Sequence, residues 1–178
     1  LEKVVIDPVL VCKGEDEALF PENVEAMVQT LLPRALVVTP NLFEAGQLSG
    51  LGNLTTIDDM KRAAEKIHAA GAKNVVIKGG KQLKHEKAVD LFYNGSTFTL
   101  LESEKTDTSY NHGAGCTFAA AITANLANGL AVDESVLEAK KFVSAAIANG
   151  WKLNEYVGPV MHGAKNRFGA PDITTSEI

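Results

Sequence analysis

Residues 56–78 have the sequence TIDDMKRAAEKIHAAGAKNVVIK, in which a segment with helical spacing is followed at once by the pattern of a buried strand. The apolar residues that recur at helical intervals are Met60, Ala63, Ala64 and Ile67. Thr56 and Asp59 have the spacing of a capping box, and Gly71 suits the end of the helix. The β-branched run at residues 74–78 predicts a strand directly after it.

The same alternation of strand and helix extends in both directions along the chain. Strands are predicted at residues 4–10, 35–39 and 74–78, and helices at residues 21–32, 42–48, 56–70, 116–126 and 133–148. Residues 88–93 and 96–101 flank Asn94-Gly95, a dipeptide that favours a hairpin and hence an antiparallel edge. We therefore predict an α/β fold with a mainly parallel sheet. Residues 170–178 have no periodicity and are expected to form a loose tail.

Composition limits the classes of protein to which the chain can belong. Its 178 residues are 46% apolar and 22% charged, which excludes disorder and predicts a single domain. The net charge of -5 argues against binding to nucleic acid, and no apolar run approaches the roughly 20 residues that span a membrane. The two cysteines, Cys12 and Cys116, have neither disulfide-framework nor zinc-ribbon spacing, so reduced thiols in the cytoplasm are expected.

The first strand pattern begins at residue 4, with no methionine and no leader before it. A continuous apolar run of this kind is typical of a strand in the middle of a parallel sheet, covered on both faces. We therefore expect a cut chain whose neighbouring strands are missing.

Residues 111–117, NHGAGCT, form a loop with two glycines that opens into an apolar helix, which is expected to be buried on nearly every side. The N–H groups of Ala114, Gly115 and Cys116 would point at one spot with the positive end of the helix dipole and form an anion hole for a phosphoryl group. The same field would stabilise a Cys116 thiolate, which suits this residue to act as a base. The alternative is a small buried cysteine beside glycines that only turn the chain.

Polar residues also follow each predicted parallel strand, at the edge of the sheet where ligands of open α/β folds collect. Asn41 and Glu44 follow the second strand, and Glu44 would hold nucleotide-bound Mg²⁺ through waters. Lys78 ends the third strand and would neutralise phosphate charge. Asp7 ends the first strand and would contact metal or phosphate waters. Taken singly, a helix-capping Asn41, a solvated Glu44, a strand-end Lys78 and a turn-forming Asp7 remain the alternatives.

Three motifs together resemble the ribokinase-like vitamin kinases: TPNLFEA at residues 39–45, VIKGG at residues 76–80 and NHGAGCTFAAA at residues 111–121. Similarity is greatest to hydroxymethylpyrimidine and phosphomethylpyrimidine kinases, which act in thiamine biosynthesis, and to the related bacterial pyridoxal kinases of vitamin B6 metabolism. The resemblance implies a three-layer α/β/α sandwich that comprises residues 1–169. The family's N-terminal third has no counterpart here.

The resemblance also implies phosphoryl transfer from MgATP to the hydroxymethyl group of a vitamin precursor. Cys116 occupies the position of the catalytic base. The implied anion hole consists of Gly113, Ala114 and Gly115 with the N–H of Cys116. Asp7 and Glu44 match the acidic positions that organise magnesium, and the positions on the nucleotide side match Asn41, Lys78 and Gly80. Dimers are common in the family, so a homodimer is expected.

Two departures from the pyrimidine kinases bear on the substrate. Ala114 stands where those enzymes usually carry threonine. Residues 11–14, VCKG, resemble instead the lid of bacterial pyridoxal kinases in which a cysteine adds to the pyridoxal aldehyde. Cys12 would then bind substrate, and the alternative is a loop cysteine without function. These departures favour pyridoxal over hydroxymethylpyrimidine.

Two other functions remain open on the sequence. A cysteine hydrolase would use Cys116 as nucleophile and the same N–H groups as an oxyanion hole, and it needs an oriented histidine base. A fragment that binds nucleotide without catalysis is the second alternative.

Overall fold

The computed structural model describes residues 2–10 and 21–178. The strands form one six-stranded sheet in the order β1-β2-β3-β4-β5-β6. They are β1 (Val5–Ile6), β2 (Val37–Val38), β3 (Val75–Lys78), β4 (Ala88–Tyr93), β5 (Phe98–Ser103) and β6 (Thr174–Glu177). The β1–β2 and β2–β3 pairs are parallel and the β3–β4 pair is antiparallel. The predicted α/β sheet with an antiparallel component is therefore confirmed.

The chain divides into two compact units, one of residues 1–100 with 176–178 and one of residues 101–175. The prediction of a single domain over residues 1–169 stays a prediction. Composition and length set the size of the core, but they contain no information on where long-range contacts become sparse.

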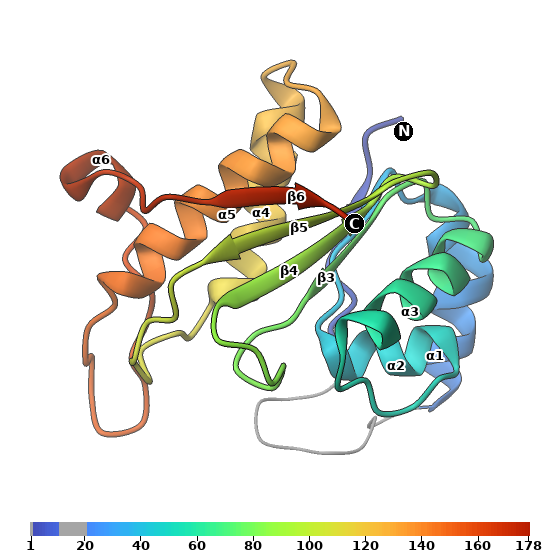
Figure 1. Ribbon diagram of the computed structural model, residues 1–178, viewed down its shortest axis with the longest axis horizontal. Coiled ribbons are helices and arrows are strands. Elements are labelled where there is room, and N and C mark those ends of the chain that lie inside the picture. Colours follow the sequence, from blue (N-terminus) through green and yellow to red (C-terminus); the bar gives the residue numbers. More distant parts are fainter. Residues whose placement is uncertain (1, 11–20) are drawn as a thin grey trace. The chain divides into compact units, whose positions relative to one another are not determined.

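The helices of the first unit lie side by side (Figure 1). They are α1 (Pro21–Ala26), which continues as a π-helical turn (Met27–Leu31) and a 3₁₀ turn (Leu32–Arg34), α2 (Leu42–Ser49) and α3 (Ile57–Ala69). The predicted helical face of α3 is fully buried at Met60, Ala63, Ala64 and Ile67. The helix predicted at residues 21–32 is followed by Pro33, which lies inside the 3₁₀ turn, because proline is tolerated in the first turn of such an element.

The second unit contains α4 (Ala114–Ala127), α5 (Val132–Ala148) and α6 (Ala164–Phe168). Helices α4 and α5 pack against each other along their lengths. The helix predicted at residues 133–148 begins one residue earlier, so Asp133 lies in its first turn, and the N-cap is Ala131, whose N–H donates to Glu134 Oε2 at 3.3 Å. Helix α6 was not predicted, since its five residues are too few for a periodic pattern.

The end of the chain is a further correction. Residues 170–178 were expected to be loose, yet Thr174–Glu177 form β6, and the N–H of Ile178 donates to the carbonyl oxygen of Phe98 at 3.1 Å. Backbone pairing orders this segment although its side chains lack an apolar alternation. Within the described ranges, no helix has the length and apolar character required to cross a membrane.

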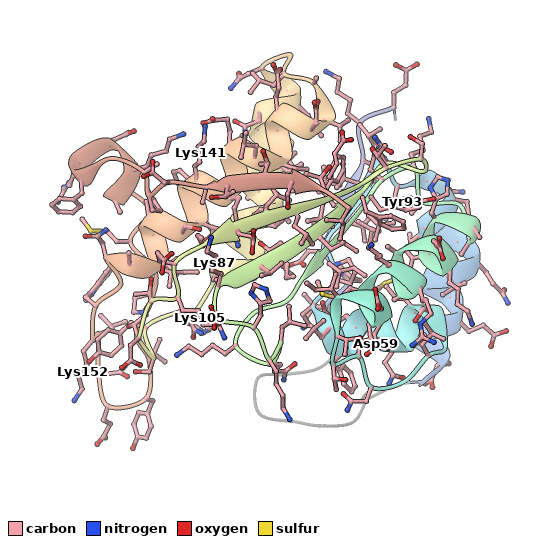
Figure 2. All side chains as sticks on the ribbon, in the orientation of Figure 1. Asp59, Lys87, Tyr93, Lys105, Lys141 and Lys152 are labelled. Atoms are coloured by element: carbon pink, nitrogen blue, oxygen red, sulfur yellow. The ribbon has the colours of Figure 1, made fainter. Side chains whose placement is uncertain are left out.

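The capping box predicted at the start of α3 is present, and Figure 2 labels its Asp59. Thr56 Oγ1 accepts from the N–H of Asp59 at 3.1 Å, and Asp59 Oδ2 accepts from the N–H groups of Thr55 and Thr56 at 2.9 and 3.0 Å. Arg62 also donates to this carboxylate. These hydrogen bonds, that from Thr55 first, hold the pKa of Asp59 well below its usual range. The ionised carboxylate thus stabilises the beginning of α3.

Asp59→Asn is expected to lower the free energy of unfolding at pH 7. A carboxyl whose pKa is depressed by folding contributes its full stability above its unfolded pKa of about 3.9 and loses that contribution progressively as the pH falls from there toward its lower folded pKa. The stability difference between parent and variant should therefore shrink below about pH 4. Urea unfolding at pH 7, 5 and 3 measures it. The control is Asp58→Asn, an exposed position in the same turn, and equal pH dependence in both variants would contradict the assignment.

Candidate active site

The carboxyl ends of β1, β2 and β3 bring Asp7, Thr39 and Lys78 together. Lys78 Nζ lies 2.9 Å from Asp7 Oδ1, and the hydroxyl of Thr39 donates to the same oxygen at 3.2 Å. Thr39 is fully buried. Its role was missed in the sequence, because a threonine that ends a β-branched strand has no pattern distinct from the strand itself. The sequence-predicted pair Asp7 and Lys78 is thus one half-buried ion pair.

Asn41 and Glu44 complete this group of residues, which we term the carboxyl-edge cluster (Asp7, Thr39, Asn41, Glu44 and Lys78). Asn41 is the N-cap of α2, its Oδ1 accepts from the N–H of Glu44 at 2.8 Å, and its own N–H donates to Glu44 Oε2 at 2.7 Å. The N–H of Lys78 donates to the carbonyl oxygen of Pro40 at 2.8 Å and ties the end of β3 to the start of α2. The helix-capping alternative for Asn41 therefore holds, and it fixes the Glu44 carboxylate.

The Glu44 side chain is not solvated, since it is only 4% exposed. Burial raises its pKa, the N–H of Asn41 and the charge of Lys78 lower it, and the negative charge of Asp7 raises it. Two carboxylates therefore share one ammonium group, an arrangement that an additional cation would stabilise. Mg²⁺ is usually bound by one or two carboxylates with phosphate and water oxygens completing its shell. The carboxylates fit that mode; residues 2–10 and 21–178 contain no group of three or more acidic, histidine or cysteine ligands.

The segment after β3 depends on Gly79. Its N–H donates to the carbonyl oxygen of Val89 at 3.0 Å and to Asp90 Oδ1 at 3.2 Å, and a Cβ at this position would lie 2.3 Å from the Val89 oxygen. Only glycine fits there. Gly80 follows with a positive φ of 57° and is exposed. Asp90, which the sequence analysis missed, is 8% exposed, and its signal is that it is the one acidic residue in the apolar strand β4.

In the second unit, the predicted anion-hole loop leads directly into α4. Gly113 is the N-cap, with φ 82° and no capping side chain. The N–H of Ala114 donates to the carbonyl oxygen of Asn111 at 3.2 Å, so the expected set of three donors is reduced. The N–H groups of Gly115 and Cys116 find no acceptor in the described part of the chain. These two donors, at the positive end of α4, constitute the candidate anion site.

A cavity of about 560 Å³ adjoins this helix start. The residues that line it are Gly113, Cys116, Thr117, Ala120, Ala121, Ala124, Asn125, Glu138, Phe142, His162 and Lys165. Cys116 is exposed, so the expectation that α4 is buried on nearly every side is wrong for the face that carries it. The small side chains on that face leave room for the cavity instead of packing a neighbour.

Three side-chain interactions involve residues that line the cavity. Thr117 Oγ1 lies 3.0 Å from His162 Nε2, and the sequence analysis assigns no role to His162. Glu138 lies 2.7 Å from Lys141 Nζ and 2.6 Å from Lys165 Nζ, which lowers the pKa of the Glu138 carboxyl (Figure 2 labels Lys141). Cys12, predicted to bind substrate, lies outside the described residues.

Comparison with known proteins identifies the family to which this arrangement belongs. The family model described as phosphomethylpyrimidine kinase matches residues 1–161. A putative pyridoxine kinase of Staphylococcus aureus (strain COL) is 60% identical over 174 residues, which are 98% of this chain and 63% of the relative. A hydroxymethylpyrimidine/phosphomethylpyrimidine kinase of Rhizobium meliloti is 42% identical over 163 residues, 90% of this chain and 61% of the relative.

The fold matches that of a solved enzyme. Structures of the pyridoxal kinase from Staphylococcus aureus, in complex with pyridoxal and with ADP, align with TM-scores of 0.94 and 0.95 at 57% and 58% identity. Both alignments cover 99% of this chain and 64% of the solved chain. The chain thus spans slightly less than two thirds of the relatives that it matches, and it belongs to the phosphomethylpyrimidine kinase family.

Proposed function

We propose that this chain carries the catalytic part of an ATP-dependent kinase that phosphorylates the hydroxymethyl group of pyridoxal or pyridoxine. The observation that carries the proposal is the start of α4, where the N–H groups of Gly115 and Cys116 lack an acceptor beside a cavity lined by Cys116. A phosphoryl group in transfer needs donors placed in advance and a base on the acceptor hydroxyl. The names of the relatives support this chemistry over the hydrolase alternative.

In the proposed reaction, the two N–H groups donate to oxygens of the transferring phosphoryl group. The Cys116 thiolate accepts the proton of the substrate hydroxyl, whose oxygen then bonds to phosphorus as the bond to ADP breaks. The hydrolase alternative needs a histidine that orients the thiol. His162 is the histidine that lines this cavity, and its Nε2 is engaged by Thr117.

The carboxyl-edge cluster would neutralise the negative charge of the nucleotide phosphates. The Lys78 ammonium, held 2.9 Å from Asp7, would bind phosphate oxygens. Asp7 and Glu44 would hold Mg²⁺, which neutralises phosphate charge when bound. Asn41 keeps the Glu44 carboxylate in place through its N–H, and Gly79 and Gly80 leave the backbone after β3 open for a close approach by phosphate.

A pyridine ring is favoured over a pyrimidine ring. The pyridoxine kinase relative is 60% identical and the pyrimidine kinase relative 42% identical. Ala114 in place of the usual threonine, and Cys12 in the lid-like segment, agree with this preference. Cys12 would add reversibly to the pyridoxal aldehyde, whereas pyridoxine has no aldehyde at that carbon. Turnover on pyridoxal, pyridoxine and hydroxymethylpyrimidine therefore separates the ring preference from the aldehyde preference.

Cys116→Ala is expected to lower kcat by roughly 10²- to 10⁴-fold, the usual contribution of a positioned base, with little effect on ATP affinity. ADP release is measured for the chain alone and for a chimera in which it replaces the matching residues of the Staphylococcus aureus pyridoxal kinase. The matched control is Thr123→Val on the exposed face of the same helix. Ring-independent ADP release, or unchanged kcat in Cys116→Ala, would refute the proposal.

Lys78→Met is expected to weaken ATP binding by about 10- to 100-fold, because a hydrogen bond to a charged group contributes about 1.5–3 kcal/mol. Lys73→Met is the control, since Lys73 is exposed just before the same strand. Calorimetric titration with MgATP measures both, with circular dichroism as a check on folding. Equal affinities in the two variants would remove Lys78 from the nucleotide site.

A further inference from the structure

Helix α4 begins differently from α2 and α3. The first turns of α2 and α3 are closed by capping boxes, in which Asn41 and Thr56 accept backbone N–H groups. Helix α4 has Gly113 at the N-cap and no capping side chain. A capping side chain would occupy the N–H groups that the proposed anion site requires. The first turn of α4 must therefore be stabilised by contacts that leave those groups open.

Residues 158–162, which we term the strap, provide such contacts. The N–H of His112 donates to the carbonyl oxygen of Gly158 at 3.0 Å, and the N–H of Val160 donates to that of His112 at 3.2 Å. The N–H of Met161 donates to the carbonyl oxygen of Ala146 in α5 at 2.9 Å. The strap thus joins the loop before α4 to the end of α5 through the backbone.

A side chain of the strap, that of His162, forms a hydrogen bond with α4 itself. Its Nε2 lies 3.0 Å from Oγ1 of Thr117, a buried residue next to Cys116. Threonine inside a helix commonly bonds back to the carbonyl four residues earlier, as Thr123 does to Ala119 at 2.9 Å. Thr117 instead directs its hydroxyl across to the strap. The contrast within one helix shows that this hydrogen bond is tertiary.

We propose that His162 is a positioning residue, which holds the first turn of α4 through Thr117 so that the N–H groups of Gly115 and Cys116 stay aligned for an anion. The inference rests on the proposed function in that these groups are the anion site. The inference goes beyond the proposed function because it names a residue outside the loop and the helix, His162, that holds the anion site in place.

The test uses the whole chain without nucleotide or vitamin. Alkylation of Cys116 by anionic iodoacetate and by neutral iodoacetamide is followed by peptide mass mapping, which separates Cys116 from Cys12. The ratio of the two rates, relative to that of free N-acetylcysteine, reports anion attraction at the start of α4. His162→Leu and Thr117→Val should each lower this ratio by about fivefold, as expected for the loss of one hydrogen bond.

Matched variants distinguish positioning from a general loss of structure. The double variant His162→Leu/Thr117→Val should lose no more than either single variant, since both remove one interaction. Thr117→Ser keeps the hydroxyl and should keep the ratio. Thr123→Val makes the same change as Thr117→Val on the same helix and should also keep it.

The inference would be overturned if His162→Leu had the same ratio of alkylation rates as the parent. It would also be overturned if Thr123→Val lowered the ratio as much as Thr117→Val. A parent chain without any iodoacetate preference would overturn it too. If His162→Leu fails to fold, Thr117→Val provides the same test with a nearly isosteric change. If the variants lower the ratio but the chimera with the Staphylococcus aureus pyridoxal kinase shows no turnover on any vitamin, the role of His162 is supported and the proposed function is refuted, so the two failures are distinguishable.

Discussion

The second unit depends on one constraint: α4 begins with backbone N–H groups that find no acceptor in the described part of the chain. Such groups favour an anion, and they persist only if neighbouring structure holds the helix start without covering it. Gly113 turns the chain into α4 in the left-handed region, where a residue with a side chain would be strained. The strap then stabilises the first turn of α4, as a capping residue does in α2 and α3. The small side chains of α4 leave space for a cavity that Cys116 lines.

The candidate site of the first unit differs from that of the second. It consists of charged side chains, whereas the start of α4 offers backbone N–H groups. Lys78 forms an ion pair with Asp7. The buried Glu44 accepts a hydrogen bond from the backbone N–H of Asn41 and interacts with the charges of both Lys78 and Asp7. Burial without sufficient positive charge raises the pKa of Glu44, so the cluster is stabilised by any cation that enters it. The capping box of α2 serves two purposes here, since it begins the helix and fixes a carboxylate at the edge of the sheet.

Much of this arrangement follows from local sequence, and the parts that do not are tertiary. The face of α3, the β3 strand and the placement of Asp7 and Lys78 at one edge were predicted, because periodicity and parallel pairing determine them. The contact between Thr117 and His162 joins residues 45 positions apart, and no spacing rule links them. The bond from Ala114 to Asn111 reduces the predicted donors through loop geometry, which residue types alone do not specify. Strand β6 is held by backbone pairing and needs no alternation of apolar side chains, so the sequence contains no pattern from which it could be predicted.

The central claim is that the start of α4 binds the transferring phosphoryl group through two backbone donors. The most direct measurement is a titration of the ¹⁵N-labelled chain with MgATP, followed by the amide resonances of Gly115 and Cys116. We expect both to shift downfield, and the amide of Ala114, which already donates to Asn111, to shift much less. Nucleotide binding that leaves Gly115 and Cys116 unshifted while other amides move would contradict the account.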